Sequence, residues 1–168
     1  MKHQLLILSV ILLIIFTNSC RNETGFEAEL VPIKEYLQVE HFTFESQVDS
    51  VHKSLLQNVV IINSIEQLKY TFEIWNLEAP YVLKQFDYEK YTLLLRFIID
   101  SGVRKDIEHY LTRNYKTGIF TYMIVFNANE AYHKVNSTNH PEFFFFYTGI
   151  LIDKILDDSK IEAWQRIS

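Results

Sequence analysis

The segment from Asn58 to Trp75 constrains the fold of this chain more than any other. Residues 59–62 are all β-branched, a run that is typical of a buried strand. Ser64 and Gln67 follow with the spacing of a capping box, which predicts that a helix begins there. Apolar side chains then recur at spacings of three, four and three: Ile65, Leu68, Phe72 and Trp75. These spacings place them on one helical face, which must be buried against another element.

Beyond Pro80, the sequence favours strands over helices. Four segments have the composition of strands, and a turn at residues 116–118 joins the second to the third: residues 91–99, 105–115, 119–126 and 143–152. Arg96 is the only charged side chain inside the first segment. One helix followed mainly by sequential strands predicts an α+β domain with a mostly antiparallel sheet and one main amphipathic helix packed on one face. We expect residues 33–168 to form this single domain.

Three other segments have weaker patterns. Residues 37–44 alternate irregularly, as a strand could, and residues 49–57 are compatible with a helical turn or with a loop. The tail after residue 152 is charged, and its apolar residues Ile161, Trp164 and Ile167 lie at helical spacing.

Composition excludes several classes of function. The chain has 168 residues and a formal net charge of −5, which disfavours nucleic acid as a partner. It has one cysteine, Cys20, so it can form neither an intrachain disulfide nor a cysteine-rich zinc site. Its 4 glycines form no G-x-S-x-G, P-loop or G-x-G-x-x-G motif. We therefore predict no catalytic motif and no cofactor.

The N-terminus is organised like a secretory signal peptide. Lys2 lies in a short polar start, and an apolar run follows at residues 5–16, interrupted only by Ser9. As a helix this run would be about 18 Å long, which is short for a hydrocarbon core of about 30 Å. We predict that residues 1–19 are a signal peptide that is cleaved before Cys20.

The end of this leader resembles the lipobox of bacterial lipoproteins, in which a small residue such as Ser19 precedes an obligatory cysteine. The resemblance implies lipidation of Cys20, whose sulfur receives a diacylglyceryl group, so that acyl chains such as palmitate attach the protein to the membrane. Residues 20–32 are then a lipidated tether. Arg21 follows the cysteine, where an aspartate is associated with inner-membrane retention, so the resemblance implies an outer-membrane location on the periplasmic face. The alternative is a plain signal peptide or an uncleaved anchor in which Cys20 is incidental.

The segment from Val59 to Ile155 resembles a class of uncharacterised bacterial envelope lipoproteins. The resemblance rests on the strand leading into the helix at Asn63 and Ser64, and on the phrase from Phe86 to Leu94 that precedes the strands. It extends loosely to the C-terminal domain of protease-complex accessory subunits. No catalytic motif accompanies it, so it implies a fold more than a function.

The histidines and acidic pairs are the remaining candidates for chemistry. His41, His52 and His109 are scattered, whereas His133 and His140 share a polar loop with Glu130 and Glu142. A metal site in that loop is the alternative to solvated side chains. Two acidic pairs lack a catalytic partner in the sequence: Asp87 with Glu89, and Asp157 with Asp158. We predict no metal site and treat these groups as solvated.

The aromatic run from Phe143 to Tyr147 is the most unusual feature of the domain. It is either a central core strand or, if one face is open, a surface that stacks on a sugar or a partner peptide. Together, these features predict a lipid-anchored bacterial envelope protein whose domain does binding or accessory work without catalysis, with a possible envelope protein partner. The alternatives are a small envelope hydrolase with a site assembled from scattered residues, and a protease-modulating partner.

Overall fold

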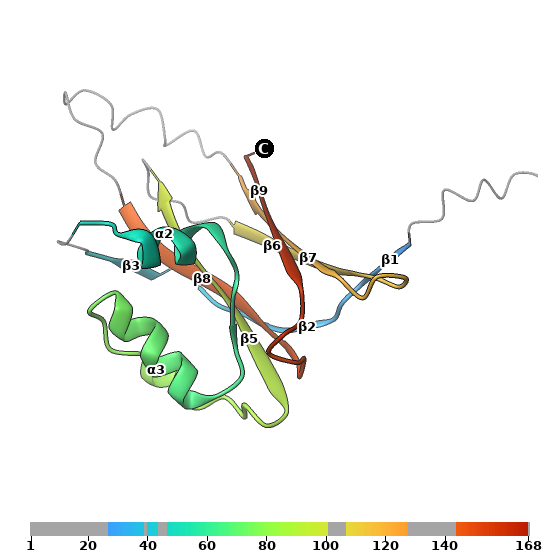
Figure 1. The fold of residues 1–168 in the computed structure, drawn as a ribbon, viewed down its shortest axis with the longest axis horizontal. Helices are drawn as coiled ribbons and strands as arrows, with labels where there is room; N and C mark the ends of the chain where they lie inside the picture. The colour runs from blue at the N-terminus through green and yellow to red at the C-terminus, as the bar shows by residue number, and fades with distance from the viewer. Residues whose placement is uncertain (1–26, 39, 44–46, 101–106, 128–143, 168) are drawn as a thin grey trace, which may run out of the picture.

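The computed structural model describes residues 27–38, 40–43, 47–100, 107–127 and 144–167, and these form three layers. Helices cover one side of a five-stranded sheet, and a four-stranded sheet covers its other side (Figure 1). The helices are α2 (Ser50–Gln57), α3 (Ile65–Ile74) and α4 (Tyr81–Lys84). The α+β class is confirmed. The strands, however, divide between two sheets.

The five-stranded sheet has the order β2-β8-β5-β4, and β3 also pairs with β8. Its strands are β2 (Ile33–Tyr36), β3 (Glu40–Phe42), β4 (Val60–Ile62), β5 (Tyr91–Asp100) and β8 (Phe144–Asp153). The central pair is antiparallel along its whole length, from Tyr91 opposite Asp153 to Asp100 opposite Phe144. This pair is covered on both faces and forms the centre of the molecule.

The predicted helix packs on this sheet as expected. The Gln67 backbone N–H donates to Ser64 Oγ over 3.2 Å, and Gln67 Oε1 accepts from the backbone N–H of Asn63 over 2.6 Å. The helix starts where the capping pattern predicts. Its inner face is buried, with the ring of Phe72 5.9 Å from that of Phe97 and the ring of Trp75 stacked on Phe97 at 5.1 Å.

The aromatic run at the start of β8 belongs to the core. Phe146 faces the four-stranded sheet, whereas Phe145 and Tyr147 pack on the helical side. Phe146 is fully buried and Tyr147 is 7% exposed. The core interpretation is confirmed for these residues. Phe143 lies outside the described residues.

The four-stranded sheet has the order β1-β6-β7-β9. Its strands are β1 (Ala28–Leu30), β6 (Ile107–Asn114), β7 (Phe120–Phe126) and β9 (Ile161–Ile167). The predicted hairpin is present between β6 and β7, and Gly118 adopts φ +70, a conformation that favours glycine. Asn114 Oδ1 accepts from the backbone N–H groups of Lys116 and Thr117, each over 2.9 Å.

Four segments differ from, or sharpen, their predictions. The C-terminal segment is a strand and not a helix, because β7 offers it a complete backbone edge and pairs with it in parallel. Residues 28–30 lie within the predicted tether, yet they pair with β6. Residues 50–57 are helical, and Asp49 caps them by accepting from the backbone N–H groups of Val51 and His52. Among the described residues of the segment 37–44, residues 40–42 form a strand.

None of the helices in the described ranges is long and apolar enough to cross a bilayer.

Candidate functional site

Polar side chains from four strands meet in the apolar space between the two sheets. They are Arg96 on β5, His109 on β6, Tyr122 on β7 and Thr148 on β8. Each is at least 93% buried, since the most exposed of them, His109, retains 7% of its surface. Apolar side chains of the core surround them, among them Leu94, Ile98 and Ile124. We call these four residues the intersheet cluster.

Three members of the intersheet cluster form a hydrogen-bonded chain. Thr148 Oγ1 donates to the backbone carbonyl of Leu37 over 3.3 Å. With its only proton used there, this hydroxyl accepts from His109 Nε2 over 3.1 Å. His109 Nδ1 is then unprotonated and accepts from the hydroxyl of Tyr122 over 2.8 Å. The network thus assigns the proton of the imidazole to Nε2.

Burial keeps this chain neutral. It lowers the pKa of His109 to about 4, because an imidazolium would lose its hydration there. Burial also raises the pKa of the Tyr122 hydroxyl above its ordinary value. Both nitrogens of His109 already have hydrogen-bond partners, so the imidazole has no free lone pair with which to take a proton from a substrate. Its evident role is to connect the two sheets.

Arg96 is the exception within the intersheet cluster. Its side chain is 5% exposed, and Nη2 donates to the backbone carbonyl of Leu56 over 3.4 Å. Nε and Nη1 are buried and have no acceptor among the residues that the structure describes. Burial lowers the pKa of the guanidinium, and the nearby Tyr122 opposes this effect. The intrinsic pKa of a guanidinium is so high that the group stays charged. Among the described residues, no carboxylate pairs with it.

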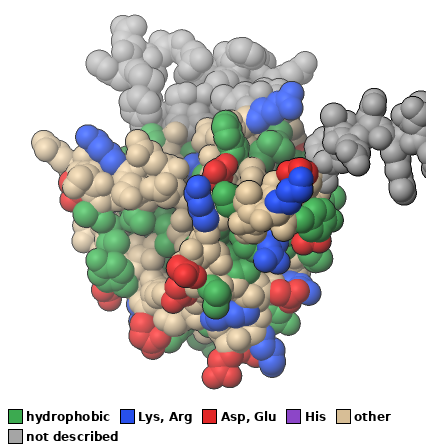
Figure 2. Space-filling model, turned by 45° about the vertical axis from the view of Figure 1, so that its right-hand side comes forward, with side chains coloured by type: hydrophobic (Ala, Val, Ile, Leu, Met, Phe, Trp, Pro, Cys, Tyr) green, Lys and Arg blue, Asp and Glu red, His purple; other side chains and the backbone are tan. Residues whose placement is uncertain are grey.

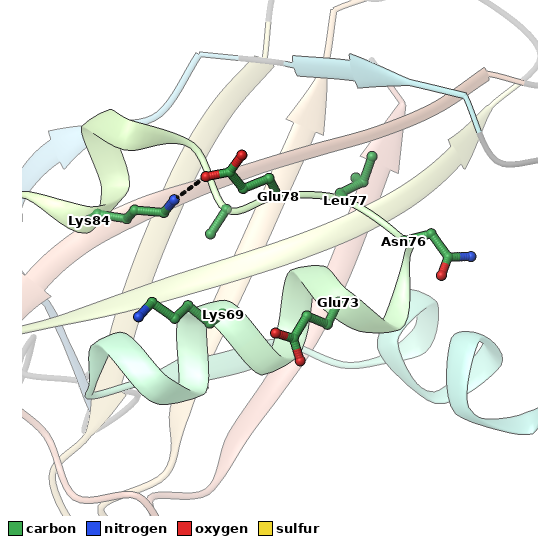
Figure 3. Close-up of a pocket in the computed structure, with 7 residues that line it drawn as sticks. Lys69, Glu73, Asn76, Leu77, Glu78 and Lys84 are labelled. Atoms are coloured by element: carbon green, nitrogen blue, oxygen red, sulfur yellow. Dashed lines mark hydrogen bonds and ion pairs between the residues drawn. The ribbon is translucent and has the colours of Figure 1, made fainter.

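A surface hollow of about 540 Å³ lies between α3 and the segment that leads into α4. Figure 3 shows Lys69 and Glu73 projecting from α3 and the pair Lys84–Glu78 on the opposite wall. Lys84 Nζ lies 2.7 Å from Glu78 Oε1 and holds the pKa of that carboxyl below its usual range. The charges alternate in sign and lie in or near solvent, so the hollow selects neither anions nor cations.

A smaller hollow of about 250 Å³ lies beside α4 and is mostly apolar. Leu37, Pro80, Val82 and Leu83 line it together with Tyr147, whose pKa is raised to about 12 by burial. Its only acidic residue is Glu40. This arrangement contains no pair of groups that could transfer a proton or attack a substrate.

The candidates from the sequence do not converge on one site. His52 is buried, with Nδ1 2.7 Å from Asp49 Oδ1 and Nε2 2.9 Å from the carbonyl of Ile74. Of His41, only the backbone is described, in β3. The described part of the chain contains no group of three residues that could hold a metal. Several candidates lie outside the described residues: Cys20, Glu130, His133, His140 and Glu142.

The acidic pairs serve local structure. Asp87 pairs with Lys90 over 2.7 Å, and this lysine lowers the pKa of the Asp87 carboxyl. Asp157 is exposed and accepts a short hydrogen bond from Asn63 Nδ2. Asn63 also donates to the carbonyl of Ile155 over 3.1 Å, so these contacts fasten the start of α3 to the segment after β8.

The face of the molecule in Figure 2 carries basic and acidic side chains interspersed with hydrophobic ones. Neither sign of charge dominates the described residues of this face.

Comparison of the chain with protein-family models, with curated proteins and with solved structures finds no match.

Proposed function

We propose that this chain is a lipid-anchored protein of the bacterial cell envelope and that its domain binds a partner or ligand without catalysis. The observation that carries the anchor is the position of Cys20, the only cysteine of the chain, directly after a short apolar leader and a small residue. By the resemblance to lipoproteins, the acyl chains hold the protein at the outer membrane, on its periplasmic face.

The position of the folded domain supports this proposal. The described part begins at Glu27, close in sequence to Cys20. A chain covers at most about 3.6 Å per residue, so residues 20–27 keep the domain within roughly 30 Å of the anchored sulfur. Two or three acyl chains hold a protein firmly at a bilayer, because each buried methylene contributes about 0.8 kcal/mol.

The interior of the domain supports binding over catalysis. His109 uses both ring nitrogens for hydrogen bonds inside the fold, which removes it as a general base.

The anchor is tested by labelling a bacterial host with an alkyne-tagged palmitate while it expresses the full chain. We expect the wild type to carry the label and to begin at a modified Cys20 in mass spectrometry. The Cys20→Ser variant should lack the label and keep its leader. Ser19→Ala is the matched control, because alanine is also small and should allow processing. An unmodified polypeptide that starts at Met1, or a label that persists in Cys20→Ser, contradicts the proposed anchor.

A further inference from the structure

We propose that two copies of this chain associate through strand β9, edge to edge and antiparallel, so that their four-stranded sheets continue into one. This inference rests on the binding function proposed above and names the partner as a second copy of the chain.

The first argument is the edge that β9 leaves open. In the described part of the chain, its one strand neighbour is β7 (Figure 1). The other edge strands are short: β1, β3 and β4 have 3 residues each, and β2 has 4 and shifts its register between Ile33 and Glu35. Strand β9 has 7 residues, pairs with β7 in an unbroken register and contains no proline. A long, regular edge of this kind is a template for a further strand.

The second argument is the direction of the backbone groups of β9. The carbonyl of Lys160 accepts from the backbone N–H of Phe120, which lies on β7. Along a parallel ladder every second residue bonds to the same neighbour, so residues 162, 164 and 166 also direct their backbone groups to β7. The N–H and C=O groups of the residues between them, Ala163 and Gln165, therefore point to the open edge.

The third argument is the register that the charges select. Residues 162, 164 and 166 share one face of β9, because side chains alternate along a strand. When the pairing is centred on Trp164, each Glu162 lies opposite Arg166 of the partner subunit, and the two Trp164 side chains lie opposite each other. Centring it on Ala163 would instead place Lys160 opposite Arg166 of the partner subunit, and these cations repel. The charges of β9 thus match those of a second copy when Trp164 is at the centre.

The fourth argument is that these pairs occupy the close positions of the ladder. Ala163 carries free backbone groups, so it exchanges hydrogen bonds with Gln165 of the partner subunit. The Trp164 pair and the Glu162–Arg166 pairs are then the non-hydrogen-bonded ones, whose Cα atoms are about 4.5 Å apart and whose side chains lie closest. Lys160 Nζ lies 3.9 Å from Glu162 Oε1, but both side chains are about half exposed or more, so this contact contributes little and leaves Glu162 available.

The fifth argument is an apolar row on the outer face of the four-stranded sheet. Tyr122 and Ile124 belong to the core between the sheets, so Met123, which alternates with them, faces outward. Trp164 and Tyr110 lie on either side of Met123 in register, and they are 60% and 40% exposed. Pairing at β9 joins the rows of two copies across six strands and covers part of the exposed Trp164 ring.

Sedimentation equilibrium of the full chain, purified from a bacterial host in density-matched detergent, tests the association. We expect the wild type to form a dimer. Glu162→Arg places arginine opposite arginine twice and should raise the dissociation constant by roughly 10-fold or more. Adding Arg166→Glu to that variant exchanges the charges and should restore the dimer. Glu35→Arg is the matched control, because it makes the same charge change on the exposed surface of β2, in the other sheet.

Cysteine crosslinking tests the register. Trp164→Cys brings two cysteines to a Cα separation of about 4.5 Å, which a disulfide can span. Glu162→Cys leaves its two cysteines about 14 Å apart along the strands, beyond the reach of a disulfide. After mild oxidation of the cells, non-reducing electrophoresis should show a covalent dimer for Trp164→Cys and none for Glu162→Cys. The wild type, whose one cysteine is Cys20, gives the background.

The pairing is wrong if the wild type is monomeric, or if Glu162→Arg and Glu35→Arg dimerise equally well. It is also wrong if the charge exchange fails to restore the dimer, or if the two cysteine variants crosslink alike. The anchor is judged separately, by the labelling of Cys20. A labelled chain that stays monomeric refutes the pairing and leaves the anchor standing, whereas an unlabelled chain that dimerises through β9 does the reverse.

Discussion

The hydrogen-bonded chain through His109 predicts a specific dependence of stability on pH. Burial lowers the pKa of this imidazole to about 4 in the folded protein, whereas in the unfolded chain it returns to its ordinary value of 6.5. Between these values the unfolded chain binds a proton that the folded protein does not. The free energy of unfolding therefore rises with pH through this window and is lowest below it.

The magnitude follows from the size of the pKa shift. One pKa unit corresponds to about 1.4 kcal/mol, so His109 alone should lower the free energy of unfolding by about 3 kcal/mol on acidification from pH 6.5 to pH 4. The variant that isolates this effect is His109→Gln. A glutamine amide can accept from Tyr122 and donate to Thr148, but it does not titrate.

Urea denaturation monitored by circular dichroism, at pH values from 4 to 7, measures the effect. We expect the wild type to lose about 3 kcal/mol more than His109→Gln over this range. Carboxylates with lowered pKa values, such as Glu78 and Asp87, also lose stability on acidification, but they do so equally in both proteins. His52→Gln is the matched control, since it retains His109 and hence this part of the slope. Parallel pH profiles for the wild type and His109→Gln would refute the neutral, Nε2-protonated assignment.

Two further predictions concern packing. Phe72→Ala on the buried face of α3 should lower the free energy of unfolding by roughly 3–5 kcal/mol. Tyr70 lies on the same helix and is 66% exposed, so Tyr70→Ala should change the free energy of unfolding by less than about 0.5 kcal/mol. Equal effects of the two substitutions in urea denaturation would show that α3 is not packed as described. Gly149→Ala should cost about 3 kcal/mol or more, because its Cβ would lie 2.3 Å from the Leu94 carbonyl oxygen. Gly118→Ala, with open space but φ +70, should cost only about 1–2 kcal/mol, and the reverse order in thermal unfolding would contradict the close approach of β5 and β8.

The candidate site was only partly visible in the sequence. Arg96 stands out as the one charged side chain in an apolar strand, and alternation places it on the same side of that strand as Leu94. His109 lies in a polar segment and offers no such signal. The sequence also leaves the protonation of His109 open, because its tautomer depends on Tyr122 and Thr148, which come from other strands.

Local pattern determined the elements of this protein. The β-branched run, the cap at Ser64 and the spacing of Phe72 and Trp75 specify a strand and a helix from contacts within a few residues. Tertiary structure decided which strands pair and which side chains lie against one another. The alternation of side chains along a strand tells which of them share a face, but it does not tell which sheet lies opposite that face. The parallel pairing of β9 with β7, and the hydrogen bonds of His109 with Tyr122 and Thr148, depend on contacts between different strands, which local periodicity does not encode.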